Sequence, residues 1–417
     1  MQESKPSKAF TSDSLAHRHV LIIPAWWPSS DEPAAGVFNV DYARAFASAG
    51  ATVGVVVPDA VGLRRVLRGA RAPWRPRVVT ESIDKIPVLR IRGISTSLGR
   101  PAAHMAQFLR QLRLGVREYV ARFGAPDVLH AMCAIPAGWA AVELAKDIGG
   151  GKRVPVVVTE HTGPFALALR PPQAGDFTRA ALRRADAVAA VSNHLRDQMI
   201  AAGIERAIEV IANPVSDVFQ FAPPPMIEQD TAGRQRFRIA FVGRLTAEKG
   251  LWELATATEA LARDAAFTLD WRIAGDGPLR GPLQRRLEAC IGRSQVTFHG
   301  WLDRPATARV LGDSHVMVLP SHGETFGLAV AEALCVGRPV VATTGTACDA
   351  HVDATNGLLC AIGDADGLAA AIRGALTNYE RWDHRGISER ARAGYAPAAV
   401  AARYAELYAR VRAASPN

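Results

Sequence analysis

The chain has 417 residues, of which 49% are hydrophobic and 21% are charged, a composition that is typical of a folded protein and excludes an intrinsically disordered one. This length exceeds what one hydrophobic core usually organises, so we expect two domains. The net charge of +9 favours anionic partners such as phosphates, lipid head groups or nucleic acid.

Signals for targeting and redox chemistry are few. No apolar run approaches the roughly 20 residues that a membrane-spanning helix needs. The polar start, residues 1–18, lacks the apolar middle of a secretory signal and is expected to be a flexible tail. The cysteines are odd in number and show no C-x-x-C pairing, which favours reduced thiols in a cytoplasmic protein over a disulfide framework or a zinc site.

Strands and helices alternate along residues 19–218. This stretch begins with HVLIIPAWW (strand), GVFNVDYARAFASAG (helix) and ATVGVVVP (strand), and it continues through VPVVVTEH to IEVIANPV. Short Val and Ile runs separated by amphipathic segments indicate β-α-β units and a parallel sheet. We therefore predict a first, Rossmann-like domain here.

The alternation repeats along residues 237–396, from RFRIAFVGRL to RPVVATTG. Residues 219–236 hold three consecutive prolines and little apolar sequence, which predicts a linker. The apolar helical repeat at 397–417 is expected to pack toward the first domain. The predicted fold is α/β, with two doubly wound, Rossmann-like domains facing across a cleft and ligands at the carboxyl ends of the strands.

The segment SHGETFGLAVAEALCVG carries two carboxylates, Glu324 and Glu332, eight residues apart. A helix predicted from Gly327 presents free N–H groups from Phe326 onward, which form a ready anion site. Because a helix rises about 1.5 Å per residue, the two carboxylates can straddle a diphosphate at its start. The alternative interpretation is a solvated loop acid and an ordinary helix residue, although a buried glutamate without a partner is costly.

Two further strand ends carry candidate ligand-binding residues. GRLTAEKG places Arg244 and Lys249 after a predicted strand, where two cations can neutralise the charge on a departing phosphate. The alternative is a loop with solvated basic residues. In AGDGPLR, Gly275 permits close backbone approach.

These motifs occur together in one order and spacing. GRLTAEKG, IAGDGPLR, VMVLPSHGETFGLAVAEALCVGRPVVAT and NGLLCAIGD make the second half similar to the large family of retaining glycosyltransferases called family 4, which has the GT-B fold. The similarity extends more loosely into the first half, through DVLHAMCAIPAGWAAVELAK and VVVTEHTG. Glu324 and Glu332 resemble the E-x7-E motif of that family.

The resemblance implies a role for each residue of the second domain. Glu324 would contact hydroxyls of the donor sugar, and Glu332 would contact the ribose of the nucleotide. Arg244 and Lys249 would hold the diphosphate. The backbone N–H groups implied to assist them belong to Phe326, Gly327 and Leu328.

In the first domain the resemblance is partial. Gly36 resembles the glycine loop that approaches the phosphates and the acceptor, and His161 is implied to line the cleft. His130 matches the first histidine of an HxH arrangement, but Met132 replaces the second. His130 is therefore either a donor-binding residue or a hydrogen-bonded residue at a strand end.

The family resemblance implies transfer with retention, with the leaving phosphate helping to deprotonate the acceptor. We see no D-x-D-type motif placed to bind a metal, so no metal or cofactor is expected. The expected substrates are a UDP-, GDP- or ADP-sugar and a glycan or lipid-linked glycan acceptor of cell-envelope or exopolysaccharide biosynthesis. The alternatives are a GT-B-fold nucleotide-sugar epimerase and a non-catalytic GT-B binding subunit.

A basic stretch, GLRRVLRGARAPWRPR, falls in the first domain. Arginines mixed with Leu and Trp can hold a segment at an anionic membrane surface, such as the inner face of the membrane. The alternative is a solvated loop, and nucleic-acid binding is disfavoured because no nucleic-acid module is recognisable. The arginines are Arg64, Arg65, Arg68, Arg71, Arg75 and Arg77.

Overall fold

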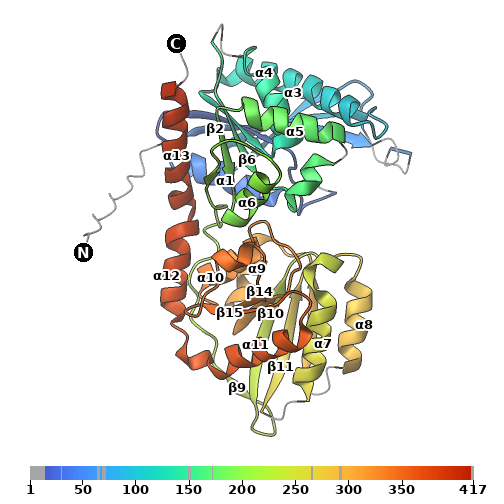
Figure 1. Cartoon of the computed structure of the whole chain (residues 1–417), viewed down its shortest axis with the longest axis vertical. Helices are drawn as coiled ribbons and strands as arrows, with labels where there is room; N and C mark the ends of the chain where they lie inside the picture. The colour runs from blue at the N-terminus through green and yellow to red at the C-terminus, as the bar shows by residue number, and fades with distance from the viewer. Residues whose placement is uncertain are drawn as a thin grey trace, which may run out of the picture. The chain divides into compact units, whose positions relative to one another are not determined.

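The structure, a computed structural model, describes residues 15–29, 31–62, 66–67, 72–148, 150, 152–170, 172–263, 266–290 and 294–414 (Figure 1). The chain divides into two compact units. The N-terminal unit comprises Met1–Val191, Arg196–Pro214 and Pro397–Asn417, and the C-terminal unit comprises Ser192–Leu195 and Val215–Ala396.

The sheet of the N-terminal unit has, within the described ranges, the strand order β3-β4-β2-β1-β5-β6-β7-β8. β3 pairs antiparallel with β4, and the other pairs are parallel. The central strands are buried on both faces, as their continuous Val and Ile runs require in a parallel sheet. The strands are β1 (His19–Pro24), β2 (Thr52–Gly62), β3 (Arg77–Ile83), β4 (Ile86–Ser95), β5 (Val128–Met132), β6 (Val156–Glu160), β7 (Ala187–Ala190) and β8 (Glu209–Val210).

Helices cover both faces of this sheet. α1 packs with α13 against one face, and α3, α4 and α5 pack together on the other. This two-sided covering is the doubly wound arrangement that the sequence predicts. The helices are α1 (Val37–Ser48), α3 (Pro101–Phe123), α4 (Trp139–Leu144), α5 (Pro172–Arg184), α6 (Asn193–Ala201) and α13 (Pro397–Ala414), with short helical turns at Ala134–Gly138 and Phe165–Leu169.

The last helix, α13, completes the core of the N-terminal unit. Its Tyr404 and Tyr408 are fully buried and meet Tyr42 and Phe46 of α1 edge to face. In Figure 1, α13 is the dark red helix beside α1. The C-terminal helix therefore returns to the first domain, as predicted.

The C-terminal unit repeats the architecture. In the part of the chain that is described, its sheet runs β12-β11-β10-β13-β14-β15 with all pairs parallel, and β9 adds antiparallel to β10. The strands are β9 (Glu228–Gln229), β10 (Gln235–Val242), β11 (Phe267–Ala274), β12 (Gln295–Gly300), β13 (Val316–Leu319), β14 (Val340–Thr343) and β15 (Gly357–Cys360).

Two groups of helices cover the second sheet. α7 contacts α8 and α11, whereas α10 contacts α9 and α12. α10 is buried from Val330 to Val336, which explains why its sequence is apolar on every side. The helices are α7 (Leu251–Ala262), α8 (Arg280–Cys290), α9 (Arg304–Gly312), α10 (Leu328–Val336), α11 (Ala365–Thr377) and α12 (His384–Tyr395), with short 3₁₀ turns at Ala247–Lys249, Ala347–Ala350 and Tyr379–Arg381.

The segment expected to be a linker, residues 219–236, lies inside the C-terminal unit. The buried guanidinium of Arg338 donates to the carbonyls of Ala222 and Pro223 and so ties the proline-rich run to the unit. Burial lowers the pKa of Arg338 to about 10. None of the helices in the described ranges is both long and apolar enough to cross a membrane.

Candidate active site

The loop before α10 brings Glu324 and Lys249 together. Lys249 Nζ donates to Glu324 Oε1 at 2.6 Å, and Ser321 Oγ donates to the same oxygen at 2.7 Å. Lys249 ends the 3₁₀ turn that follows β10, and Glu324 follows β13, so both lie at the carboxyl end of adjacent parallel strands. This is the edge where an open α/β sheet binds its ligands.

Arg244 lies in the same loop as Lys249 but points elsewhere. Its side chain is 74% exposed and forms a 3.5 Å ion pair with Glu248. An exposed arginine next to the site can reach an incoming anion. It does not take part in the Glu324 cluster itself.

A left-handed glycine opens α10. Gly327 is the N-cap, with a left-handed φ of 79°, and Leu328 is the first helical residue. The first N–H groups of a helix lack partners within it. The preceding residue, Phe326, is held because the ring of His351 bonds to its carbonyl oxygen. Burial lowers the pKa of His351 to about 4, so this imidazole is neutral at physiological pH.

Glu332 lies one and a half turns inside α10 and is only 3% exposed. Its carboxylate forms an ion pair with the guanidinium of Arg304, the first residue of α9. Glu332, which the sequence predicts to contact the ribose, therefore has a protein partner, and this ion pair offsets the free-energy cost of burying its charge. The sequence prediction did not include Arg304.

The turn at Gly275 approaches neighbouring backbone closely. A Cβ at this position would lie 1.8 Å from the carbonyl oxygen of Gly243, so only glycine fits. The N–H of Gly275 donates to the carbonyl oxygen of Gly300 at 2.8 Å, and this hydrogen bond joins the ends of β11 and β12. The expected close approach therefore occurs between backbone segments at the carboxyl edge of the sheet.

In the N-terminal unit, Gly36 forms the turn before α1. Its φ is 64°, and a Cβ there would lie 2.3 Å from the carbonyl oxygen of Trp26. The amide of Asn39 donates to the same oxygen at 2.7 Å and closes the turn. The α1 N-terminus is thereby held at the carboxyl end of β1.

His161 follows β6 and contacts the beginning of α1. Its ring centroid lies 4.6 Å from that of Phe38 and 5.8 Å from that of Tyr42. Burial lowers the pKa of His161 to about 3, so the imidazole is neutral. The Nε2 atom is buried and has no hydrogen-bond partner among the described residues. Gly36 and His161 therefore share one region of the N-terminal unit.

Glu160, the last residue of β6, holds this region in place and was not predicted from the sequence. Its fully buried carboxylate accepts from three backbone N–H groups, those of Ala134 at 2.8 Å, His161 at 3.0 Å and Thr162 at 2.8 Å. These bonds tie the end of β5 to the end of β6. The signal in the sequence was an acid at the end of a valine-rich strand, directly before a candidate histidine.

His130 has no ring nitrogen left for a ligand. Nε2 bonds to Thr159 Oγ1 at 2.7 Å and Nδ1 bonds to Tyr408 Oη at 2.6 Å. The residue is fully buried, and burial lowers its pKa to about 3. The donor-binding prediction for His130 is corrected accordingly: this geometry fits the alternative of a hydrogen-bonded strand residue, and we exclude it from the site.

The basic stretch is described only in part, because Arg64, Arg65, Arg68 and Arg71 lie outside the described residues. Within the described part of this stretch, Trp74 is 80% exposed and Leu67 is 79% exposed. Arg77 and Arg92 line a shallow pocket of about 430 Å³ beside Trp74. No group of three or more potential metal ligands occurs among the described residues.

Two family models match this chain. Residues 35–218 match the model described as Glycosyltransferase Family 4, and residues 236–378 match the model described as Glycosyl transferases group 1. The chain belongs to the family 4 glycosyltransferases.

Proteins similar in sequence to this chain are named as glycosyltransferases. A 2-deoxystreptamine glucosyltransferase from Streptomyces kanamyceticus is 27% identical over 342 residues, which is 76% of this chain and 86% of that protein. A GDP-mannose-dependent alpha-(1-6)-phosphatidylinositol dimannoside mannosyltransferase from Mycobacterium tuberculosis is 32% identical over 166 residues, 40% of this chain and 42% of that protein.

Solved structures support the GT-B fold of the glycosyltransferase. Sucrose-phosphate synthase from Thermosynechococcus elongatus aligns with a TM-score of 0.70 at 21% identity, covering 95% of this chain and all of that one. Anabaena HepE in complex with UDP and glucose aligns with a TM-score of 0.65 at 19% identity, covering 94% of this chain and 100% of that one.

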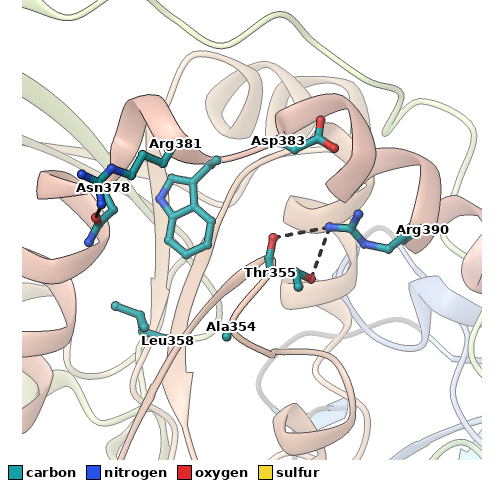
Figure 2. Close-up of a pocket in the computed structure, with 8 residues that line it drawn as sticks. Ala354, Thr355, Leu358, Asn378, Arg381, Asp383 and Arg390 are labelled. Carbon is teal, nitrogen blue, oxygen red and sulfur yellow. Dashed lines mark hydrogen bonds between the residues drawn. The ribbon is translucent and has the colours of Figure 1, made fainter.

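A further pocket of the glycosyltransferase lies away from this site. It has a volume of about 440 Å³ and is lined by residues around β15, α11 and α12. Figure 2 shows Arg390 reaching across to Thr355, its guanidinium 3.4 Å from the carbonyl oxygen and 3.3 Å from Oγ1. Because Thr355 precedes β15, the pocket lies at the amino ends of the strands, the edge opposite Glu324 and Lys249.

Proposed function

We propose that this glycosyltransferase moves a sugar from a UDP-, GDP- or ADP-sugar to a glycan or lipid-linked glycan, with retention and without a metal ion. The proposal is carried by one observation, the contact of Lys249 with Glu324 beside the first turn of α10. At this strand edge a cation and free helix N–H groups suit the charge of a leaving diphosphate, and a carboxylate suits the hydroxyls of the sugar attached to it.

Lys249 and the N-terminus of α10 would hold the diphosphate, with exposed Arg244 closing on it from solvent. Their positive charge favours departure of the nucleotide, because they stabilise the charge that develops on its phosphate. A lysine has three donors, so Lys249 can contact Glu324 and phosphate together. These cations are why we propose that no metal is needed.

Glu324 would orient the donor sugar. An ionised carboxylate offers about four acceptor positions, and Lys249 and Ser321 take two of them. The others suit sugar hydroxyls. His161, held neutral by burial, would offer the sugar or the acceptor a hydrogen bond through Nε2 rather than a charge. The leaving phosphate itself would take the acceptor proton.

The acceptor is proposed to belong to cell-envelope or exopolysaccharide biosynthesis and to be reached by a cytoplasmic enzyme at the inner face of the membrane. Exposed Trp74 and Leu67, within the basic stretch, support peripheral contact with anionic lipid. One relative is named for 2-deoxystreptamine and another for phosphatidylinositol dimannoside, so the acceptor panel should contain both a soluble and a lipid-borne compound.

The deciding experiment is a thermal-shift panel of UDP-, GDP- and ADP-sugars with and without magnesium. We expect one nucleotide class to raise Tm and magnesium to leave that rise unchanged. Release of the free nucleotide on adding an acceptor, with the anomeric configuration of the product read by NMR, then tests transfer and retention. No stabilisation by any nucleotide-sugar would favour a non-catalytic binding subunit, and turnover of the donor without an acceptor would favour an epimerase.

A further inference from the structure

The ion pair between Arg304 and Glu332 joins two helices at the ligand-binding edge of the C-terminal unit. α9 starts after β12 and α10 starts after β13, so both helix starts lie at the carboxyl ends of parallel strands. The two helices pack on each other. Arg304 is the first residue of α9, and it therefore reaches Glu332 from the same edge that carries Lys249 and Glu324.

Several contacts fix Arg304 in place. Asp303 caps α9 by accepting from the Ala306 N–H at 2.8 Å, and proline follows Arg304 at the start of the helix. The guanidinium also lies over the ring of Phe219, 5.4 Å from its centroid. A planar guanidinium stacked on a ring and bonded to a carboxylate has little rotational freedom.

This pair does more than a stable core needs. A buried ion pair is often no more stabilising than apolar side chains of the same volume, because both charges lose their hydration. The side chain of Glu332 is 4% exposed and that of Arg304 is 14% exposed, so little water reaches them. What the pair supplies is a carboxylate whose direction is fixed.

We propose that Arg304 is a positioning residue that aims Glu332 at the ribose of the nucleotide donor. This inference rests on the proposed function. Arg304 occupies Oε1 and fixes the plane of the carboxylate, so that its remaining acceptor positions face the ribose hydroxyls. Arg304 acts through Glu332 in this proposal, and we assign it no contact with the phosphates.

The test is ribose discrimination. The wild type is first tested with UDP, GDP and ADP to find the nucleotide that it binds most tightly. The affinities of this ribonucleotide and of its 2′-deoxy analogue are then measured by calorimetry. In the wild type the ribonucleotide should bind more tightly. In Arg304→Met its affinity should fall about tenfold, as the loss of one oriented hydrogen bond predicts, and that of the deoxy analogue should fall less. The ratio of the two affinities then moves toward one.

The matched control is Arg309→Met, which removes a charge from the exposed face of α9 and should keep the wild-type ratio. If Arg304→Met does not fold, the same affinity ratio is measured in Arg304→Lys. This variant keeps the positive charge and loses the contact between the planar guanidinium and the carboxylate of Glu332. Its ratio should fall at least about threefold, since the ammonium no longer fixes the carboxylate plane.

The outcomes separate the two proposals. An unchanged ratio in the folded Arg304 variants, a tighter complex in Arg304→Met, or no ribose preference in the wild type would overturn the positioning role alone. A wild type that binds none of the three nucleotides would overturn the proposed function together with this inference.

Discussion

The carboxyl ends of the two sheets differ in how they handle charge. In the C-terminal unit, glutamates meet cations, Lys249 with Glu324 and Arg304 with Glu332. In the N-terminal unit, Glu160 accepts from three backbone N–H groups, and burial keeps His161 neutral. A site built from full charges suits a diphosphate, whereas neutral rings and fixed loops suit sugars and hydroxyl groups.

The largest effect is expected for Glu324→Gln, which removes a charge from the carboxyl edge of the C-terminal sheet. The amide keeps the shape but loses the charge that pairs with Lys249, so kcat should fall about 100-fold or more, in the range seen when one preorganised electrostatic group is removed. Steady-state kinetics with a donor and acceptor found in the panel would measure this. Glu259→Gln, which removes an ion-paired carboxylate from α7, is the control and should retain activity. Equal kinetics in the two variants would remove Glu324 from the site.

Lys249→Ala should lower turnover more than stability. Without the ammonium, the charge on the leaving phosphate loses its main side-chain partner, and we expect kcat to fall about tenfold to 100-fold. Thermal melting, run beside the kinetics, separates the two effects. A variant that melts early but turns over normally would show that Lys249 is structural.

Glu332→Ala should act on binding. Loss of the ribose hydrogen bonds should weaken the nucleotide complex by about 1–3 kcal/mol. Calorimetry with the preferred nucleoside diphosphate measures this directly. The same affinity in the variant and the wild type would contradict the ribose role.

The neutral imidazoles make the fold sensitive to acid. The pKa of His130 is about 3 in the folded chain and near 6.5 in the unfolded one, so only the unfolded chain takes up a proton between these values. Stability is therefore complete above pH 6.5 and falls as the pH drops toward 3, by roughly 2 kcal/mol at pH 5 for this one group. The free energy of unfolding, measured with urea at several pH values, should depend less on pH in His130→Asn than in the wild type. The difference in unfolding free energy between the two proteins at pH 8, where the imidazole is neutral in both states, measures the lost packing alone. Parallel slopes would contradict this account.

The smallest effect is expected on the surface. Trp74→Ser removes an aromatic side chain that is 80% exposed, so the free energy of unfolding should change by less than about 0.5 kcal/mol. Sedimentation with vesicles containing anionic phospholipid should show weaker binding than the wild type, and neutral vesicles serve as the control. Unchanged sedimentation would exclude Trp74 as a membrane contact.

The sequence predicted which charged residues gather at the sheet edge of the C-terminal unit more readily than it predicted the surroundings of the N-terminal histidines. Arg244, Lys249 and Glu324 follow strands that are easy to recognise, Glu332 lies in the helix after one of them, and a parallel sheet brings its strand ends to one edge. His130 was ambiguous because its fate depends on Tyr408, 278 residues away. Arg304 was missed for the same reason: no local pattern says which cation meets a buried glutamate 28 residues on.

The return of α13 to the N-terminal unit sets an order of events during synthesis. α1 is made near the start of the chain, yet the aromatic surface that it shares with Tyr404 and Tyr408 is covered only when the last helix appears. A nascent chain halted before residue 397 therefore leaves that surface bare, while every strand of the other unit has already been made. Synthesis of α13, rather than of the strands and helices that precede it in the N-terminal unit, is the step that completes the first domain.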